Sequence, residues 1–516
     1  MSRSHHIAIF ALLTLASVDS SAQCTEGGTE DSPTLTCTST ASGNIADNRN
    51  NLSVTVESDA QIVRTTGRPV QLGGSDQSVD NQGLIESGDD DAIRGTGANL
   101  MIDNSGTIRG GDRGIRLQDN ADNFTLINQE SGEIFARRQA VRLDNGDALE
   151  NADITNYGLI ESIDGRAIQS RGPGGTVLNH GTLRGGEEVV EAREDFTIEN
   201  HGTIAIRGLE WDATTRSWSI DGSIATDDED GVQFASGTAD NHGVILGTDD
   251  GIDIDEGRVH NHATGVIVST GSASDPMAGG SGIDVDALFE PTLGDIRTAG
   301  PLTIINEGYI EGVRAIGTDE ASTSEITIEN SGTLRGRSGT AIELAPDQGN
   351  SSLLLTGNSE IFGDVIFGGG DDLLTVEGLT SGLLINSLFD GGAGNNSVFF
   401  NDYVLSDLLS FKISDDLINL SFGIMNNGVL SGQFRNFDTW SFSNDGSFST
   451  QELASRFMTP MTPVPTPAIL PLFVLGLAGI WASRVRLTFD LFAIGLAGIG
   501  ITRQRAQFDR KRHSAA

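Results

Sequence analysis

Closely spaced carboxylates are the side chains of this sequence best suited to chemistry. The main groups are the run Asp227–Asp230, the pair Asp249 and Asp250, the pair Asp253 and Asp255, and the pair Asp284 and Asp286. Residues two apart on a β-strand point to the same side, so the last two pairs could supply the acid and base of a glycosidase or lyase. Acidic residues also recur at other turns, as in Asp89–Asp91. That recurrence is typical of acidic residues repeated on a solvent-exposed face, and no catalytic residue is predicted.

Four histidines recur at one position of a short motif. His180, His201 and His242 each stand between Asn and Gly, and His262 follows Asn261. Stacked repeats would align these imidazoles on one ridge, where a metal ladder is one interpretation. A metal site also needs supporting ligands at fixed geometry, so exposed turn residues are the simpler interpretation and no metal site is predicted.

The elements that must position these side chains are repeats of Asn-x-Gly followed by a β-branched residue or leucine, between about residues 75 and 345. The eight copies begin at Asn81, Asn104, Asn156, Asn179, Asn200, Asn241, Asn306 and Asn330. Looser copies span 128–132 and 261–265, and most neighbouring copies lie 20 to 24 residues apart. Such a period is typical of a repeat array. The longer gap between Asn200 and Asn241 is interpreted as two periods, with 220–222 near its middle.

Each repeat contains three short stretches of alternating apolar residues separated by Gly, Asp and Asn. This pattern predicts three strands per coil, and stacked coils about 4.8 Å apart would pair each strand with its counterparts. The predicted fold class is therefore all-β, a right-handed parallel β-helix with coils of about 20–24 residues. The eight asparagines are expected to form a side-chain ladder. A leucine-rich repeat is the rival fold, but its dense leucine consensus is missing.

The chain divides by composition into six predicted regions. These are a signal peptide (1–22), an N-terminal cap (23–74), β-helix repeats (75–349), further coils (350–450), a Pro-rich linker (451–467) and a C-terminal sorting segment (468–512). A basic start, an apolar run and small residues before Gln23 predict export by the Sec machinery. In an oxidising compartment, Cys24 and Cys37 are expected to form a disulfide.

Two glycine-rich turns in region 350–450 resemble the nonapeptide of calcium-binding β-rolls. The segments are 367–374 and 391–398, and their candidate calcium ligands are Asp371 and Asp372. Each segment departs once from the nonapeptide, and the two are spaced like coils. Glycine turns of further coils are the preferred interpretation, and no cofactor is predicted beyond this calcium alternative.

The tail combines Val464, Pro465, Thr466 and Pro467 with an apolar run over 468–482 and the basic Arg484 and Arg486. It resembles the PEP-CTERM sorting signal of Gram-negative bacteria, although Thr466 replaces the usual glutamate. The resemblance implies a transmembrane helix in the inner membrane, processing by an exosortase-type enzyme, and delivery to the cell surface or an exopolysaccharide matrix. A second apolar stretch, 491–499, nearly copies residues 472–480, as in a duplicated signal.

The repeats resemble the β-helical passenger domains of autotransporter and filamentous adhesins, in their Asn-x-Gly-x-Ile coils and in the turn at 363–368. The formal net charge is −40, with 32 basic and 72 acidic residues. That charge argues against nucleic-acid binding. The expected function is that of an exported, non-enzymatic surface or matrix protein for adhesion or biofilm, with a matrix polysaccharide or cell-surface ligand as partner. The alternative is a secreted polysaccharide lyase or glycosidase.

Overall fold

The computed structural model describes residues 24–457, apart from 42, 119–120, 145–150, 222–228, 273–279, 287–288, 291–294, 297–299, 319–323, 347, 380–386 and 425–427. All of the described residues belong to the first of two units into which the chain divides, Met1–Thr459. The predicted signal peptide (1–22), the motif Val464–Pro467, both apolar tail segments, Arg484 and Arg486 lie outside the described residues. Within the described part of the chain, no helix is both long and apolar enough to cross a membrane.

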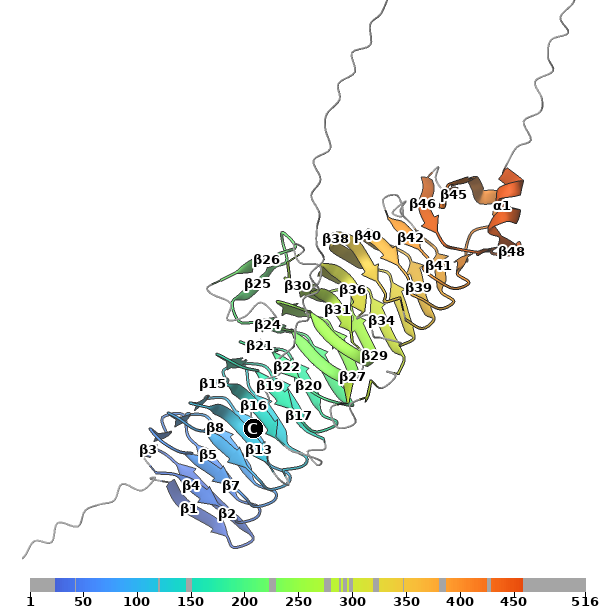
Figure 1. Cartoon of the computed structure of the whole chain (residues 1–516). Helices are drawn as coiled ribbons and strands as arrows, with labels where there is room; N and C mark the ends of the chain where they lie inside the picture. The colour runs from blue at the N-terminus through green and yellow to red at the C-terminus, as the bar shows by residue number, and fades with distance from the viewer. Residues whose placement is uncertain are drawn as a thin grey trace, which may run out of the picture. The chain divides into compact units, whose positions relative to one another are not determined.

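The first unit is a parallel β-solenoid of about 13 turns, which confirms the predicted all-β repeat class (Figure 1). Most coils contribute one strand to each of three parallel sheets. The first sheet consists of β2 (Ser32–Cys37), β5 (Ser53–Val56), β8 (Ser78–Asn81), β11 (Met101–Asn104), β14 (Thr125–Asn128), β17 (Asp153–Asn156), β20 (Thr176–Asn179), β23 (Phe196–Asn200), β27 (Val232–Asn241), β29 (Ile252–Asn261), β34 (Leu302–Asn306), β37 (Ile326–Asn330), β39 (Ser351–Thr356), β41 (Leu373–Glu377), β43 (Ser397–Phe400) and β47 (Thr439–Phe442).

The second sheet consists of β3 (Thr40–Ala41), β6 (Gln61–Arg64), β9 (Leu84–Ser87), β12 (Thr107–Gly110), β15 (Glu133–Ala136), β18 (Leu159–Ser162), β21 (Thr182–Gly185), β24 (Thr203–Ile206), β28 (Val244–Gly247), β30 (Val266–Ser269), β35 (Tyr309–Gly312), β38 (Thr333–Glu343) and β40 (Glu360–Ile366). The third sheet consists of β4 (Ile45–Asp47), β7 (Val70–Leu72), β10 (Ile93–Gly95), β13 (Arg113–Gln118), β16 (Gln139–Asp144), β19 (Ile168–Ser170), β22 (Val190–Glu191), β31 (Ser281–Val285), β36 (Arg314–Thr318), β42 (Leu388–Asp390) and β46 (Gly428–Arg435), with the first halves of β27 and β29 and the last parts of β38 and β40.

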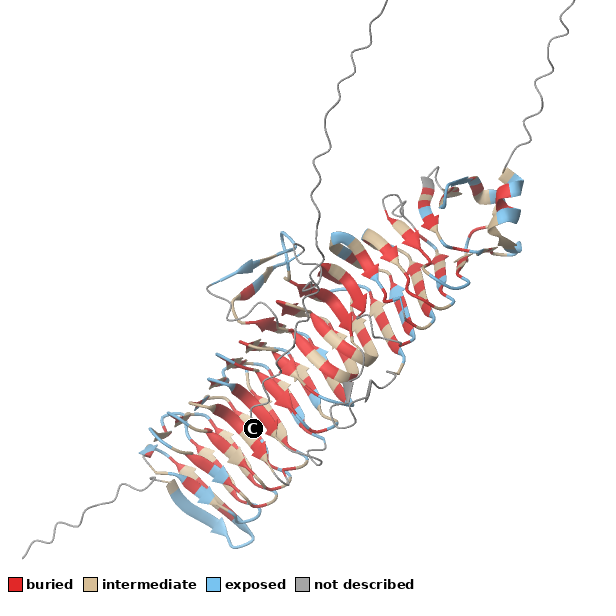
Figure 2. Cartoon of the chain, viewed as in Figure 1, coloured by how far each residue is buried: buried red, intermediate tan, exposed pale blue. Residues whose placement is uncertain are grey.

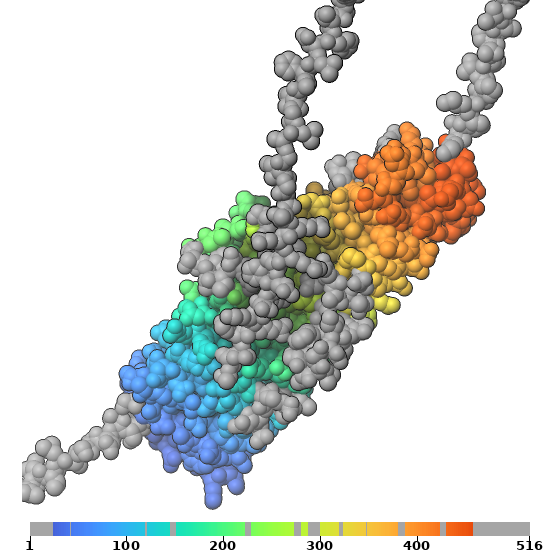
Figure 3. Space-filling view, in the orientation of Figure 1, coloured from blue at the N-terminus to red at the C-terminus, as the bar shows by residue number. Residues whose placement is uncertain are grey.

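The core lies between the three sheets and is built from alternate residues of each strand (Figure 2). In the second sheet, from β6 onward, one inward residue per coil is isoleucine or leucine and pairs in register with its counterparts. Ile85, Ile108 and Ile134 are consecutive examples, each fully buried. Burying such a side chain contributes about 1.5–3 kcal/mol, and no single coil could bury its own inward face. Stacking therefore supplies the stability, and Figure 3 shows the coils packed in chain order.

An antiparallel hairpin closes the N-terminal end. Strand β1 (Cys24–Thr29) pairs with β2, and the predicted disulfide between Cys24 and Cys37 is present. β2 also pairs in parallel with β5. Parallel coils therefore begin at β2, well before the predicted boundary at residue 75, because the strands of region 23–74 carry the same inward alternation without an Asn-x-Gly turn.

The C-terminal end is closed by antiparallel strands and a helix, not by further coils alone. After the 3-10 turn η1 (Leu405–Asp407), the chain forms β44 (Leu408–Ser414), β45 (Leu417–Ile424), β48 (Gly446–Ser449) and α1 (Thr450–Phe457). The predicted linker over 451–467 is thus wrong at its start. Helix α1 buries Leu453, and Trp440 beneath it donates a hydrogen bond to Thr450 Oγ1 at 2.9 Å. This cap covers the apolar end of the stack.

The 41-residue gap holds one coil with an inserted hairpin, which corrects the prediction of two periods. β24 pairs directly with β28, in register from Thr203 to Val244. Between them, β25 (Leu209–Asp212) and β26 (Ser217–Ile220) pair only with each other and stand out from the stack in Figure 1. A second, two-residue pairing of β32 (Phe289–Glu290) with β33 (Asp295–Ile296) lies between Asn261 and Asn306.

Candidate functional site

Ten buried asparagines form one hydrogen-bonded ladder beside the first sheet. They are the eight predicted residues Asn81, Asn104, Asn156, Asn179, Asn200, Asn241, Asn306 and Asn330, with Asn128 and Asn261 from the looser copies. Each Nδ2 donates to Oδ1 of the next asparagine at 2.7 to 2.9 Å. The ladder runs from Asn81 to Asn330. It stops at these two residues because the in-register residues of the adjacent coils are the apolar Val56 and Leu355. Its role is structural, because every member is buried.

The glycine of each Asn-x-Gly turn allows the coils to approach. A Cβ placed on Gly202 would lie 2.0 Å from the backbone oxygen of Gly181 in the preceding coil. The same clash with backbone recurs at Gly106 and Gly332, at 2.2 Å from the preceding glycine oxygen. The motif therefore combines a side chain that links coils with a residue that leaves room for the contact.

The third sheet carries a row of polar residues in register, one per coil. In chain order the row is Gln71, Arg94, Arg116, Arg142, Gln169, Glu191, Gln233, Asp253 and Asp284. Its first half is basic and its second half acidic.

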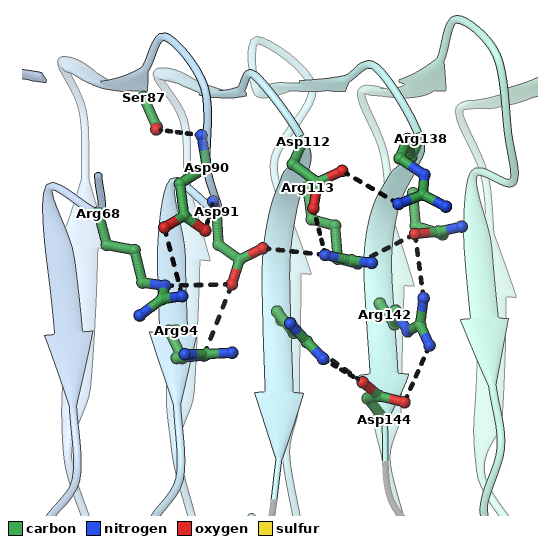
Figure 4. A network of polar contacts seen from close by, with 12 residues as sticks. Arg68, Ser87, Asp90, Asp91, Arg94, Asp112, Arg113, Arg138, Arg142 and Asp144 are labelled. Carbon is green, nitrogen blue, oxygen red and sulfur yellow. Dashed lines mark hydrogen bonds and ion pairs between the residues drawn. The ribbon is translucent and has the colours of Figure 1, made fainter. Parts of the chain in front are cut away.

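The basic half is neutralised by neighbouring carboxylates, as Figure 4 shows. The fully buried Asp91 lies 3.4 to 3.5 Å from nitrogen atoms of Arg68, Arg94 and Arg113. Burial raises the pKa of Asp91, and the arginines oppose that rise. Asp144 joins the row further on, 3.0 Å from Arg142. This half is a closed ion-pair network without a free cation among the residues drawn in the figure.

The acidic half brings together most of the carboxylates that the sequence singles out. Ser281 Oγ donates to Asp284 at 2.9 Å, and Gln233 Nε2 donates to Asp253 at 2.8 Å. The backbone N–H of Asp250 donates to Asp230 at 3.0 Å. The remaining predicted residues near this row are Asp249, Asp255 and the half-buried Asp286, whereas Asp227 and Asp228 lie outside the described residues.

Burial and mutual repulsion make these carboxyls hard to ionise. Burial, and then the neighbouring Asp253, raise the pKa of Asp255 to about 8. Burial also raises the pKa of Asp230 and Asp250 well above the ordinary range. A protonated carboxyl beside ionised ones is the arrangement that glycosidases use, so the acidic half can serve as an acid–base site. It can equally be a structural cluster that shares protons.

The histidines stack on one ridge, as predicted from their shared position. Rings of Tyr157, His180, His201, His242 and His262 follow each other with centroids 3.6 to 5.0 Å apart. We call these five residues the histidine ridge. A carboxylate contacts the ridge, since His201 Nε2 lies 2.7 Å from Glu199 Oε1. The exposed-turn interpretation is therefore incomplete.

A pocket of about 500 Å³ lies between the inserted hairpin and the turns that follow the first sheet. The hairpin contributes Trp211 and Arg216, a turn contributes Glu307, and the first residues of β35 and β40 contribute Tyr309 and Glu360. The Trp211 ring packs against the buried Tyr309 ring with centroids 5.8 Å apart. The sequence analysis missed this site, because nothing in the hairpin's residues shows which coil it folds against.

Both candidate calcium ligands form hydrogen bonds between coils. Asp371 Oδ1 accepts the backbone N–H of Asn395 at 2.8 Å, which lowers its pKa. Asp372 Oδ1 accepts the backbone N–H of Ser351 at 2.7 Å, while burial raises its pKa to about 7. These contacts fit glycine turns of further coils, and calcium binding at the two residues stays an open alternative.

Comparison of the chain with protein-family models, with curated proteins and with solved structures found no match. No relative therefore assigns a role to any residue, and each role rests on the contacts of this chain.

Proposed function

We propose that this chain is an exported, non-enzymatic surface or matrix protein whose β-solenoid binds a matrix polysaccharide. The right-handed winding that parallel strand connections favour is part of the proposal. The single observation that carries it is the pocket formed by Trp211, Arg216, Glu307, Tyr309 and Glu360. An aromatic wall with a few charged hydrogen-bonding groups suits a sugar, which has apolar ring faces and hydroxyl edges.

The charge of the chain narrows the ligand to a neutral polysaccharide. At −40, the chain repels polyanions at long range, and the pocket itself holds two glutamates against one arginine. The pocket touches the turns that follow β29, β34 and β37, so it crosses consecutive coils. An extended polymer lying across the turns would contact several coils at once.

Affinity electrophoresis in gels that contain neutral polysaccharides tests this function. Trp211→Ala should abolish retardation, because it removes the aromatic wall of the pocket. The matched control is Tyr157→Ala, which removes an exposed aromatic side chain from a turn outside the pocket. Equal retardation of both variants and the parent protein would contradict polysaccharide binding at this pocket.

Export and sorting have a separate test. The segment Val464–Pro467, the apolar run and the following arginines favour processing after export. Intact-mass analysis of surface-extracted protein should show a chain that starts at Gln23 and ends near Pro465, and deletion of 464–516 should release the protein into the medium. A native protein that keeps Ala516 and stays in the inner membrane would contradict the sorting signal.

A second function, a polysaccharide lyase or glycosidase, is favoured by the raised pKa of Asp255 beside Asp253. Depolymerisation assays over a panel of acidic and neutral polysaccharides test it. Turnover that Asp253→Asn and Asp255→Asn each abolish, without loss of the folded state by circular dichroism, would establish the enzyme and refute the non-enzymatic function.

A further inference from the structure

Three metal-ligating side chains, Asp240, His260 and His262, meet at one end of the histidine ridge, and they come from two consecutive coils. Asp240 pairs in register with His260 across β27 and β29. His262 and Glu307 each follow a ladder asparagine, so they occupy equivalent turn positions in neighbouring coils. Register between coils therefore places an aspartate and two histidines within reach of one another, and a glutamate beside the second of the two coils.

The ligand atoms already lie at nearly the spacing that a small cation requires. Asp240 Oδ1 is 3.6 Å from His262 Nε2 and 3.7 Å from His260 Nδ1. On the other side, His260 Nε2 is 3.6 Å from Glu307 Oε1. In a tetrahedral zinc site with bonds of about 2.0–2.1 Å, neighbouring ligand atoms lie about 3.3 Å apart. Small side-chain rotations would complete such a site.

We propose that Asp240, His260 and His262 bind one divalent transition-metal ion of the zinc class, with a water molecule as the fourth ligand. Glu307 lies beside the opposite nitrogen of the His260 ring, where it orients the imidazole without touching the ion. Two imidazoles with a carboxylate match the ligand preferences of Zn²⁺, whereas Ca²⁺ and Mg²⁺ prefer oxygen ligands throughout. All three side chains retain some exposure, so an ion can reach them from solvent.

Arg258 contacts two of the proposed ligand atoms. Its guanidinium donates to Asp240 Oδ1 and approaches His260 Nδ1, both at 2.8 Å. Arginine keeps its charge at all accessible pH values and has no lone pair for a metal. A bound cation must therefore displace Arg258, which makes this residue a competitor that sets the affinity.

The neighbouring triad of Glu199, His201 and His242 is a poorer site, although its ligand atoms lie within 4.8 Å of one another. The rings of His201 and His242 are nearly parallel, at 6°. The lone pairs of an imidazole lie in its ring plane, so two parallel stacked rings do not aim at one ion. The rings of His260 and His262 are tilted by 35°.

Zinc titration of the purified full chain, freed of metal by a chelator and followed at pH 7.5 by competition with a chromophoric chelator, tests the site. The parent protein should bind one ion that calcium does not displace. His262→Gln and His260→Gln should each weaken binding by more than the about 10–100-fold that loss of an outer-shell partner costs, because each removes a direct ligand. Arg258→Gln should strengthen binding, because it removes the competitor.

The matched control is His180→Gln, which removes a ridge histidine that is not part of the site. It should leave the affinity unchanged. Equal loss in His180→Gln and His262→Gln would show diffuse binding along the ridge and overturn the proposal. Absence of zinc binding by the parent, or weaker binding by Arg258→Gln, would overturn it as well. The last measurement stands even if the histidine variants fold poorly.

Discussion

Removal of one ladder asparagine from the middle of the solenoid should destabilise the whole stack. Asn200 donates from Nδ2 to Asn241 Oδ1 and accepts from Asn179 Nδ2, both at 2.8 Å. Its side chain is fully buried, so water cannot replace either bond without opening the turn. Asn200→Ala removes both amide–amide bonds at once.

The expected cost follows from those two bonds. A buried hydrogen bond contributes about 0.5–1.5 kcal/mol net, so Asn200→Ala should cost about 1–3 kcal/mol. The orphaned groups keep weaker partners, because Asn179 Nδ2 still reaches Thr203 O at 3.2 Å and Asn241 Oδ1 still accepts from the Gly243 N–H at 3.2 Å. Those contacts hold the cost within this range.

Urea unfolding followed by far-ultraviolet circular dichroism measures the effect as a lower midpoint at unchanged slope. The matched control is Asn81→Ala at the end of the ladder, where Oδ1 has no hydrogen-bond partner and one amide–amide bond, from Nδ2 to Asn104, is lost instead of two. Its cost should be about half as large. An Asn200→Ala midpoint equal to that of the parent, or an equal cost at Asn81, would refute the ladder as a source of stability.

Three further predictions concern the acid cluster, the turns and the cap. Asp255 has a pKa of about 8 in the folded chain and about 4 in the unfolded chain. The folded chain therefore loses stability relative to the unfolded chain as the pH rises from about 4 to about 8. The melting temperature should therefore fall between pH 5.5 and 8.5, and Asp255→Asn should reduce that fall. Gly202→Ala should lower the free energy of unfolding by about 1–3 kcal/mol and so lower the urea midpoint, because its Cβ would lie 2.0 Å from a backbone oxygen. An unchanged midpoint would contradict this close contact. Trp440→Ala should lower the free energy of unfolding by about 3–5 kcal/mol, since the ring is fully buried beneath the C-terminal cap. A smaller loss measured by calorimetry would contradict this prediction.

The repeat architecture was predictable because the two recurring residue types of one motif each have a structural role in the contact between coils. The asparagine of Asn-x-Gly must bond to the next coil and the glycine must let that coil approach, so both residue types recur with the coil period. Regions without the motif were harder to predict. The early coils over 32–74 keep only the inward alternation, and the antiparallel cap at β44 to β48 has strands whose pairing depends on contacts between distant residues.

The candidate sites were predictable only as far as repeat position fixes them. The alignment of His201, His242 and His262 follows directly from their place beside the ladder asparagine. The partners of these residues do not, because the alternating pattern does not show how far Asp240 or Arg258 reaches toward the next turn. The hairpin pocket was beyond sequence analysis, since Trp211 lies on an insertion whose direction depends on packing.

The inserted hairpin between β24 and β28 shows where this solenoid tolerates change. The Asn200 to Asn241 bond spans 41 residues and the Asn179 to Asn200 bond spans 21, yet both measure 2.8 Å. The ladder thus fixes where a coil must return but not how much chain it uses on the way. New loops can be inserted after the second sheet without changing the packing of the core. Insertions in such a protein are therefore expected to accumulate at the turn that follows the second sheet. Engineered epitopes or binding loops should be accepted there as well.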